Sequence, residues 1–364
     1  MRQAGSDPLH AMDLKHAQDW RELIDLQRLA GWMDGHGLGR GAITEPVLLA
    51  GGTQNVLLRF RRGEREFVLR RPSRHMRANS NETMLREARV LGALAGSAVP
   101  HPGLIQGCAD TDVIGAAFYL MEPVNGFNAG ASGLPPLHAG DRAMRRRMGF
   151  AMVDAILALG AVDVAAVGLS DFGRVEGFLE RQVPRWRQQL DSYAACAGWP
   201  GPAAIPELQP VADWLEAKRP AGFIPGILHG DFHQTNVMFR QDGPELAAVI
   251  DWELATIGDP LLDLGWMLSA WPRADGSHYG PNRLQPWDGF PTTDELIAYY
   301  TERSPRDMRN FRWHAVLACY KFGIILEGTY ARACAGQAPI ETGERLHRSA
   351  LALFQRAAEW IERG

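Results

Sequence analysis

The chain has 364 residues, 46% hydrophobic and 22% charged, and its 38 basic and 42 acidic residues give a formal net charge of −4. This composition is typical of a globular protein, and the length predicts two domains or one two-lobed unit. The acidic balance argues against a dedicated nucleic-acid-binding protein. Because no run of about 18 apolar residues occurs, we expect no membrane-spanning helix. Widely spaced cysteines and the lack of a secretory signal pattern favour a cytoplasmic location.

The sequence up to residue 122 predicts a strand-rich lobe that carries one long helix. Residues 17–37 have an apolar stripe at helical spacing. Residues 46–71 predict three strands, with turns at Gly51-Gly52 and around Gly63. A helix is expected over 81–95, and residues 116–121 predict a buried strand.

Helical patterns dominate the rest of the chain. Helices are expected over 142–160, 171–194 and 207–218, a hairpin over 227–250, and a surface loop over 271–291. Thr292 and Glu295 form a capping-box pattern that predicts the start of another helix. The predicted fold class is therefore α+β, with a small antiparallel-sheet lobe at 1–122 and a larger, mainly helical lobe at 123–364.

Residues 228–253 contain the densest group of side chains suited to catalysis. Asp231 and Asn236 lie five residues apart in a polar loop between two apolar runs, and Asp251 ends the second strand of the hairpin. This order can bring two carboxylates and an amide oxygen together. Such hard oxygen donors suit Mg²⁺ when phosphate oxygens and water complete its shell. Phosphoryl transfer needs that metal and a carboxylate that orients a hydroxyl.

The segments HGDFHQTN and IDWE resemble the aminoglycoside phosphotransferase-like family, which has the protein-kinase fold. The resemblance implies a bilobal kinase-like fold and the cofactors ATP and Mg²⁺. It also implies that helices within 142–220 and 292–360 lie on the substrate side. It assigns Asp231 as the catalytic residue that orients the acceptor hydroxyl and His229 as a brace for the loop. Asn236 and Asp251 are the implied Mg²⁺ ligands, and Asp263 matches a position that is structural in the family.

The same resemblance implies phosphate contacts upstream. Backbone amides of the first turn are expected to close over the phosphates, and the residues concerned are Gly51, Gly52, Thr53 and Asn55. Kinases use a lysine on the third strand, but no lysine occurs here between Lys15 and Lys218. Its role falls to Arg70, with Arg71 as the alternative. Glu87 is the expected helix partner of Arg70.

Residues 118–124 resemble the segment that joins the two lobes of a kinase. The resemblance places Met121 behind the adenine ring, and backbone groups of Glu122 and Val124 at the adenine edge. This assignment depends on the order of the segments along the chain, since such contacts need no particular side chain.

Nearly the whole chain, from about residue 20 to 355, resembles the branch of this family that is fused ahead of some acyl-CoA dehydrogenases. Our main hypothesis is an ATP- and Mg²⁺-dependent O-phosphotransferase that acts on a small-molecule hydroxyl, with a hydroxyacyl-CoA as the implied acceptor. The alternatives are an aminoglycoside phosphotransferase and a nucleotide-binding module without transferase activity. A protein kinase is disfavoured, because Gly230 replaces the arginine of the kinase loop. We expect no nucleic-acid or membrane partner, and the oligomeric state stays open.

Three further groups of residues have alternative interpretations. The arginines at 142, 145, 146, 147, 181 and 185 either contact CoA phosphates or form an exposed basic helix face. His233 either touches the substrate or stabilises its loop. The tryptophans, Trp266 among them, are predicted to serve packing rather than ligand binding.

Overall fold

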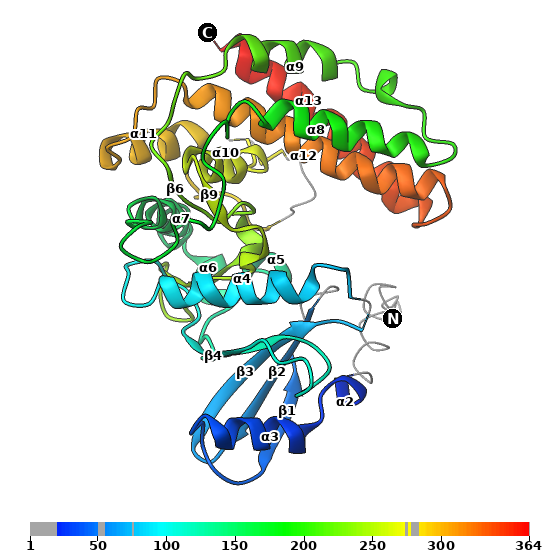
Figure 1. Cartoon of the computed structure of the whole chain (residues 1–364). Helices are drawn as coiled ribbons and strands as arrows, with labels where there is room; N and C mark the ends of the chain where they lie inside the picture. Colours follow the sequence, from blue (N-terminus) through cyan, green and yellow to red (C-terminus); the bar gives the residue numbers. More distant parts are fainter. Residues whose placement is uncertain (1–19, 50–54, 75, 274–275, 278–283, 364) are drawn as a thin grey trace, which may run out of the picture. The chain divides into compact units, whose positions relative to one another are not determined.

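The computed structural model describes residues 20–49, 55–74, 76–273, 276–277 and 284–363 (Figure 1). The chain divides into two units, one of Met1–Gly96 with His101–Asn125 and the other of Ser97–Pro100 with Gly126–Gly364. The domain organisation expected from the sequence, 1–122 and 123–364, stays a prediction. No helix in the described ranges combines the length and apolar character that a membrane crossing requires.

The first unit contains a five-stranded antiparallel sheet with the order β1-β2-β3-β5-β4 (Figure 1). Its strands are β1 (Ile43–Leu48), β2 (Asn55–Arg62), β3 (Arg65–Pro72), β4 (Leu104–Cys108) and β5 (Phe118–Met121). β2 and β3 pair in one register along their length, and Gly63 makes the turn between them with a φ of 60°. The strands predicted over 46–71 and 116–121 are present, whereas β4 has no counterpart in the prediction.

The described residues of this unit form the helices α2 (Trp20–Leu23), α3 (Leu26–Gly35) and α4 (Ser80–Ala93). The single helix predicted over 17–37 is thus wrong in one respect, because Asp25 starts a new helix. The Asp25 carboxylate accepts hydrogen bonds from the backbone N–H groups of Gln27 at 2.9 Å and Arg28 at 3.1 Å. A side chain that satisfies these first donors is the ordinary N-cap of a helix.

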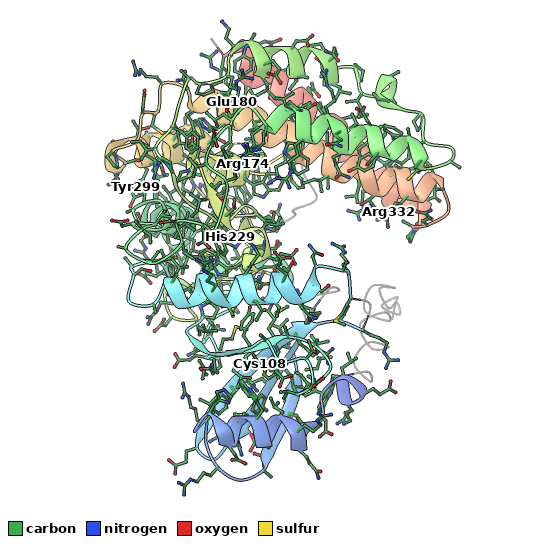
Figure 2. The ribbon with its side chains drawn as sticks, viewed as in Figure 1. Cys108, Arg174, Glu180, His229, Tyr299 and Arg332 are labelled. Atoms are coloured by element: carbon green, nitrogen blue, oxygen red, sulfur yellow. The ribbon has the colours of Figure 1, made fainter. Side chains whose placement is uncertain are left out.

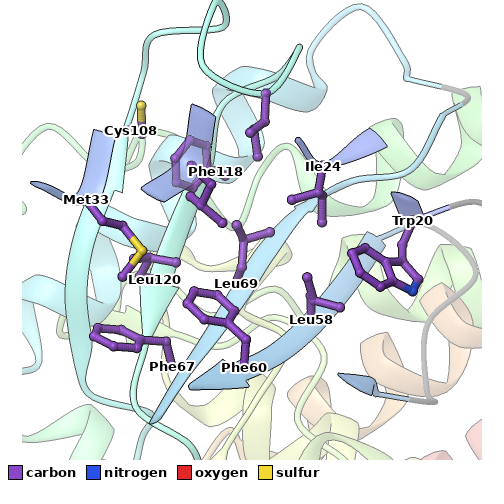
Figure 3. Packing of buried hydrophobic residues seen from close by; sticks show 12 residues of the cluster. Trp20, Ile24, Met33, Leu58, Phe60, Phe67, Leu69, Cys108, Phe118 and Leu120 are labelled. Carbon is purple, nitrogen blue, oxygen red and sulfur yellow. The ribbon is translucent and has the colours of Figure 1, made fainter. Parts of the chain in front are cut away.

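The hydrophobic core of the first unit includes residues from α3 and the sheet (Figure 3). Fully buried members include Leu29, Met33, Phe67 and Leu69. Side chains alternate between the two faces of a strand. Because Leu69 on β3 points into this core, its neighbour Arg70 points to the opposite face. The packing of one face of β3 therefore sets the direction of Arg70.

The second unit is mainly helical. Its helices are α5 (Ala129–Ser132), α6 (Pro136–Gly140), α7 (Arg142–Gly160), α8 (Gln182–Asp191), α9 (Leu208–Ala217), α10 (Leu261–Ser269), α11 (Thr293–Arg303), α12 (Phe311–Cys334) and α13 (Ile340–Glu362). The long helices α12 and α13 lie side by side (Figure 1). The predicted capping box is confirmed: Thr292 and Glu295 cap the start of α11.

Two short antiparallel ribbons stand where the sequence predicts one hairpin. β6 (Gly226–Leu228) pairs with β9 (Thr256–Gly258), and β7 (Val237–Phe239) pairs with β8 (Leu246–Val249). The loop from His229 to Asn236 begins where β6 ends and finishes where β7 begins. The ribbons therefore hold both ends of this loop.

Two other predictions in this unit need correction. Of the helix expected over 171–194, only α8 is α-helical, and turns precede it. The segment predicted as a surface loop at 271–291 buries Trp271, Trp287 and Phe290. The rings of Trp287 and Phe290 stack at 4.5 Å between centroids. Proline and glycine do interrupt helices there, but these aromatic side chains pack against one another.

Candidate functional site

Asp231 and Asn236 meet in the loop between β6 and β7. Asn236 Nδ2 donates to Asp231 Oδ2 at 2.9 Å. Asp231 Oδ1 accepts from Trp266 Nε1 of α10 at 2.9 Å, and His233 Nε2 lies 3.2 Å from the same oxygen. Thr235 donates its backbone N–H to His233 Nδ1, so the hydrogen on His233 faces Asp231. The carboxylate is thus held by three side chains.

The Asp231 carboxylate is oriented but still accessible, since its side chain is 29% exposed. A carboxylate oxygen has two lone pairs. Oδ1 uses both for Trp266 and His233, whereas among the described residues only Asn236 donates to Oδ2. One lone pair of Oδ2 is therefore available to a hydroxyl group.

The electrostatic surroundings favour the ionised form of Asp231. Burial would raise the pKa of this carboxyl group, but the hydrogen bond with His233 and nearby positive charge, including that of Lys321, lower it overall. The group is consequently a carboxylate at neutral pH. It can accept a hydrogen bond from a hydroxyl and is a weak base.

His229 connects the peptide bonds that precede Asp231 and Asp251, and it lies buried inside the second unit (Figure 2). Burial lowers the pKa of the imidazole, so the ring is neutral. Its Nδ1 accepts from the Asp231 N–H at 3.3 Å, and its Nε2 donates to the Ile250 carbonyl at 2.9 Å. This geometry matches the bracing role that the sequence suggests, and the role itself stays a proposal.

Asp263 fixes the start of the same loop. Its carboxylate accepts from the backbone N–H groups of His229 at 2.7 Å and Gly230 at 2.9 Å, and burial raises its pKa. Gly230 has a φ of 84°, and an added Cβ would lie 2.5 Å from the Leu254 carbonyl oxygen. Only glycine fits this turn, which sets the position of Asp231.

The pairing of β7 with β8 continues into a backbone contact between Asn236 and the residue before Asp251. The N–H of Ile250, the residue before Asp251, donates to the Asn236 carbonyl at 2.9 Å. Asp251 has left-handed backbone angles, φ 67° and ψ 65°. Aspartate adopts this rare conformation more readily than most residues, and such outliers concentrate at functional sites.

The donor chemistry of Asn236 and Asp251 fits Mg²⁺. Within the described ranges, no cluster of three or more His, Cys, Asp or Glu side chains is arranged to hold a metal ion. Mg²⁺ in phosphoryl-transfer sites commonly uses one or two carboxylates and fills its shell with water and substrate phosphates. One carboxylate and one amide oxygen meet that requirement without a third acidic ligand.

The first unit pairs the predicted Arg70 and Glu87. Arg70 Nε on β3 lies 3.0 Å from Glu87 Oε2 on α4, and both side chains are buried. The Tyr119 hydroxyl donates to the same carboxylate oxygen at 3.1 Å. Arg71 points elsewhere and donates to the carbonyl groups of Leu23 and Ile114. Of the two arginines, only Arg70 thus has the predicted acidic partner.

The structure describes only some of the other residues that are predicted to contact the nucleotide. Gly51, Gly52 and Thr53 lie outside the described residues. Asn55 begins β2, and Met121 ends β5 with 9% of its surface exposed. The Glu122 N–H donates to the Gly103 carbonyl at 2.8 Å. The Glu122 N–H is therefore used within the first unit, and the contacts of Met121, Glu122 and Val124 with adenine stay a prediction.

A cavity of about 570 Å³ borders the side chains that hold Asp231. Trp266 and His233 line it and also contact the Asp231 carboxylate. The other lining residues are Ala129, Gly130, Gly133, Thr235, Ala270, Leu284, Gln285 and Phe322. None of these described residues carries a carboxylate, and apolar side chains prevail. The lining formed by these described residues is therefore mainly apolar.

The sequence interpretation missed three residues at these sites. It assigned Trp266 to packing, yet this side chain donates to Asp231. Tyr119, which contacts Glu87, was not singled out. Lys321 of α12 donates to the Gly230 carbonyl at 2.9 Å. The chain has only three lysines. A lysine within a predicted apolar helix of such a chain is unusual, and this was the signal that could have indicated Lys321.

Arg145 fits neither interpretation of the arginine group. It is buried, and its Nε donates to the Asp288 carbonyl at 2.6 Å while Nη2 pairs with the Asp288 carboxylate at 3.1 Å. Arg146 is exposed and pairs with Glu295 at 2.8 Å. These two arginines therefore serve contacts within the second unit.

Comparison with known proteins gives a family match and several similar proteins. The model of the family described as "Phosphotransferase enzyme family" matches residues 47–299. Acyl-CoA dehydrogenase family member 10 of Mus musculus is 29% identical over 305 residues, which are 81% of this chain and 27% of that protein. The chain thus spans about a quarter of the length of that relative.

Solved structures share the fold. A protein from Ralstonia eutropha JMP134, described only provisionally as an aminoglycoside phosphotransferase, is 26% identical with a TM-score of 0.76, over 92% of this chain and 98% of that chain. A thermostable mutant of aminoglycoside phosphotransferase APH(4)-Ia, in a ternary complex with ADP and hygromycin B, has a TM-score of 0.55 and 16% identity, over 89% and 97%. The predicted α+β, kinase-like fold class is confirmed.

Proposed function

We propose a specific reaction for this chain on the premise that it belongs to the phosphotransferase enzyme family, whose model covers residues 47–299. The reaction transfers the γ-phosphoryl group of ATP to a hydroxyl group of a small molecule. A hydroxyacyl-CoA is the acceptor class that we favour.

Bond making and breaking in this reaction involve one phosphorus atom. A bond forms between the acceptor hydroxyl oxygen and the γ-phosphorus, and the bond from that phosphorus to the β–γ bridging oxygen breaks. ADP leaves, and the hydroxyl proton passes to the Asp231 carboxylate and then to solvent. Because the pKa of Asp231 is lowered, its main contribution is to orient the hydroxyl, as expected for a loose transition state.

The charged groups of each unit have distinct proposed tasks. Asn236 and Asp251 would hold Mg²⁺, which when bound neutralises charge on the phosphates. Arg70 supplies a permanent positive charge for the nucleotide phosphates, and Glu87 holds its guanidinium in place. The APH(4)-Ia structure of the same fold contains ADP, which supports a nucleotide as the phosphoryl donor.

The cavity beside Asp231 supports the acceptor class that we favour. Aminoglycosides are polycations, and a site for them needs carboxylates. The described lining residues include none, and Trp266, Phe322 and Leu284 form apolar walls. The similarity to an acyl-CoA dehydrogenase family member supports a hydroxylated acyl chain in this cavity.

The observation that carries the proposal is the accessible Asp231 carboxylate, oriented by three donors at the edge of the cavity. A module that only binds nucleotide has no need of an ionised group turned toward an acceptor. The same observation therefore favours an enzyme over a binding module.

The decisive experiment is a transfer assay with labelled ATP and matched acceptors. A hydroxyacyl-CoA should receive the label and appear with the added mass of one phosphoryl group. The same acyl-CoA without its hydroxyl serves as the control and should receive none, and kanamycin tests the aminoglycoside alternative. Transfer to kanamycin but not to hydroxyacyl-CoA would contradict the proposed acceptor class. Absence of transfer to any hydroxylated compound would contradict the reaction itself.

A further inference from the structure

Lys321 reaches the catalytic loop from the middle of α12. Its Nζ donates to the Gly230 carbonyl oxygen at 2.9 Å. The ammonium group also lies 4.1 Å from the ring centre of Trp266 and 5.5 Å from that of Trp186. Such contacts between a cation and aromatic rings stabilise a positive charge away from bulk water.

The carbonyl that Lys321 binds belongs to the peptide bond between Gly230 and Asp231. The N–H of that peptide bond points to His229 Nδ1 at 3.3 Å. One peptide plane is therefore held at its oxygen by Lys321 and at its nitrogen by His229. Fixing both ends of this plane fixes the Cα of Asp231, from which the carboxylate extends.

The charges around Lys321 come from several elements. Asp231 in the loop and Asp263 on α10 attract the ammonium group, whereas Arg185 on α8 repels it. Burial lowers the pKa of Lys321 to about 8 against the attraction of the two carboxylates. At neutral pH the side chain is still largely protonated, and its charge lowers the pKa of Asp231 in turn.

The Lys321 side chain is half-buried, and moving a lysine out of water is costly unless its donors and charge are satisfied. A leucine or methionine at this position of α12 could pack against Trp266 and Trp186 without that cost. The one polar contact that the lysine adds in the described residues is with the backbone of the catalytic loop. The contact thus serves the position of Asp231 rather than helix packing.

We propose that Lys321 is a positioning residue for phosphoryl transfer, which holds the Gly230–Asp231 peptide bond in place and supplies positive charge beside the Asp231 carboxylate. The inference rests on the proposed function of Asp231. Lys321 contributes in the transition state, where the acceptor oxygen must stay aligned with the phosphorus. Binding of the nucleotide in the ground state does not require it.

The test compares Lys321→Met with Lys218→Met in the full chain. Lys218 is the exposed C-cap of α9, so the control removes the same charge from a solvent-exposed side chain at the end of another helix. With labelled ATP and a hydroxyacyl-CoA, Lys321→Met should lower kcat by on the order of 100-fold, because a misplacement of about 1 Å has that effect. KM for ATP and the ATP affinity should stay within about twofold, and Lys218→Met should match the wild type.

Lys321→Arg provides the second arm, because it keeps a positive donor at the same place. It should recover most of the lost kcat with an unchanged thermal unfolding temperature. A kcat of Lys321→Met near that of the wild type would overturn the inference, as would parallel loss of folding or ATP binding in both Lys321 variants. A wild type that transfers phosphate to no hydroxylated acceptor would instead overturn the proposed function, and this inference with it.

Discussion

Replacing Trp266 with phenylalanine isolates one hydrogen bond to the Asp231 carboxylate. The indole Nε1 donates to Asp231 Oδ1 at 2.9 Å, and phenylalanine removes that donor. The aromatic ring persists, so the contact with Phe322 at 4.9 Å and the stacking under Lys321 are largely kept. The substitution therefore changes the orientation of the carboxylate more than the packing of α10.

The size of the effect follows from the type of hydrogen bond. A bond to a charged group contributes about 1.5 to 3 kcal/mol. Because the Asp231 side chain is 29% exposed, water replaces part of the lost interaction, which leaves about 1 to 2 kcal/mol. Since about 1.4 kcal/mol corresponds to tenfold in rate, kcat for phosphoryl transfer should fall about 5- to 30-fold.

The assay is steady-state transfer from ATP, and Trp313→Phe is the matched control. Trp313 on α12 is buried and donates its indole N–H to the Leu215 carbonyl at 2.8 Å. Both variants lose one buried donor and should lose similar thermal stability. Only Trp266→Phe should lose kcat, and equal kcat values in the two variants would refute the reasoning.

Three other predictions concern the turn, the ion pair and the pH profile. Gly230→Ala places a Cβ 2.5 Å from the Leu254 carbonyl oxygen at a positive φ, so we expect a loss of about 2 kcal/mol or more in the free energy of unfolding by urea denaturation, together with loss of transfer. Glu87→Gln weakens the hold on Arg70 and should raise KM for ATP about tenfold with a smaller change in kcat, whereas an unchanged KM would argue against a nucleotide role of the pair. Lys321 has a pKa of about 8, and loss of its positive charge on the alkaline side should lower kcat as pH rises through that value. In Lys321→Arg the decline should move to higher pH, because arginine keeps its proton, and a decline at the same pH in both proteins would assign it to another group.

The sequence predicted the parts of the site that depend on local spacing. Asp231 and Asn236 lie five residues apart in one loop, and the structure brings their side chains into contact. Side chains alternate between the two faces of a strand, and this alternation along β3 likewise turns Arg70 toward the helix that carries Glu87. In the first case the short spacing within one loop determines which side chains can meet, and in the second the alternation of side chains along a strand does so.

The sequence could not predict contacts made by distant elements. Trp266 and Lys321 reach the loop from α10 and α12, 35 and 91 residues away in sequence. A tryptophan in an apolar helix gives no sign of where its N–H will point. For the same reason the aromatic cluster in 271–291 was predicted as a surface loop, because composition shows the turns but not the long-range packing.

The cavity is also a product of tertiary structure. Its lining comes from α5, the catalytic loop, α10, α12 and residues 284–285. No single segment among these has the composition of a binding site. The apolar lining of the cavity, on which the proposed acceptor class depends, could therefore be recognised only in the three-dimensional structure.

The most direct test of the central claim is a single-turnover measurement of phosphoryl transfer by Asp231→Asn, with Asp242→Asn as the control. Asp242 is exposed and pairs with Arg240 at 3.0 Å. The account predicts that Asp231→Asn binds ATP as the wild type does but transfers phosphate on the order of 1,000-fold more slowly, whereas Asp242→Asn transfers at the wild-type rate. Undiminished transfer by Asp231→Asn would contradict the account.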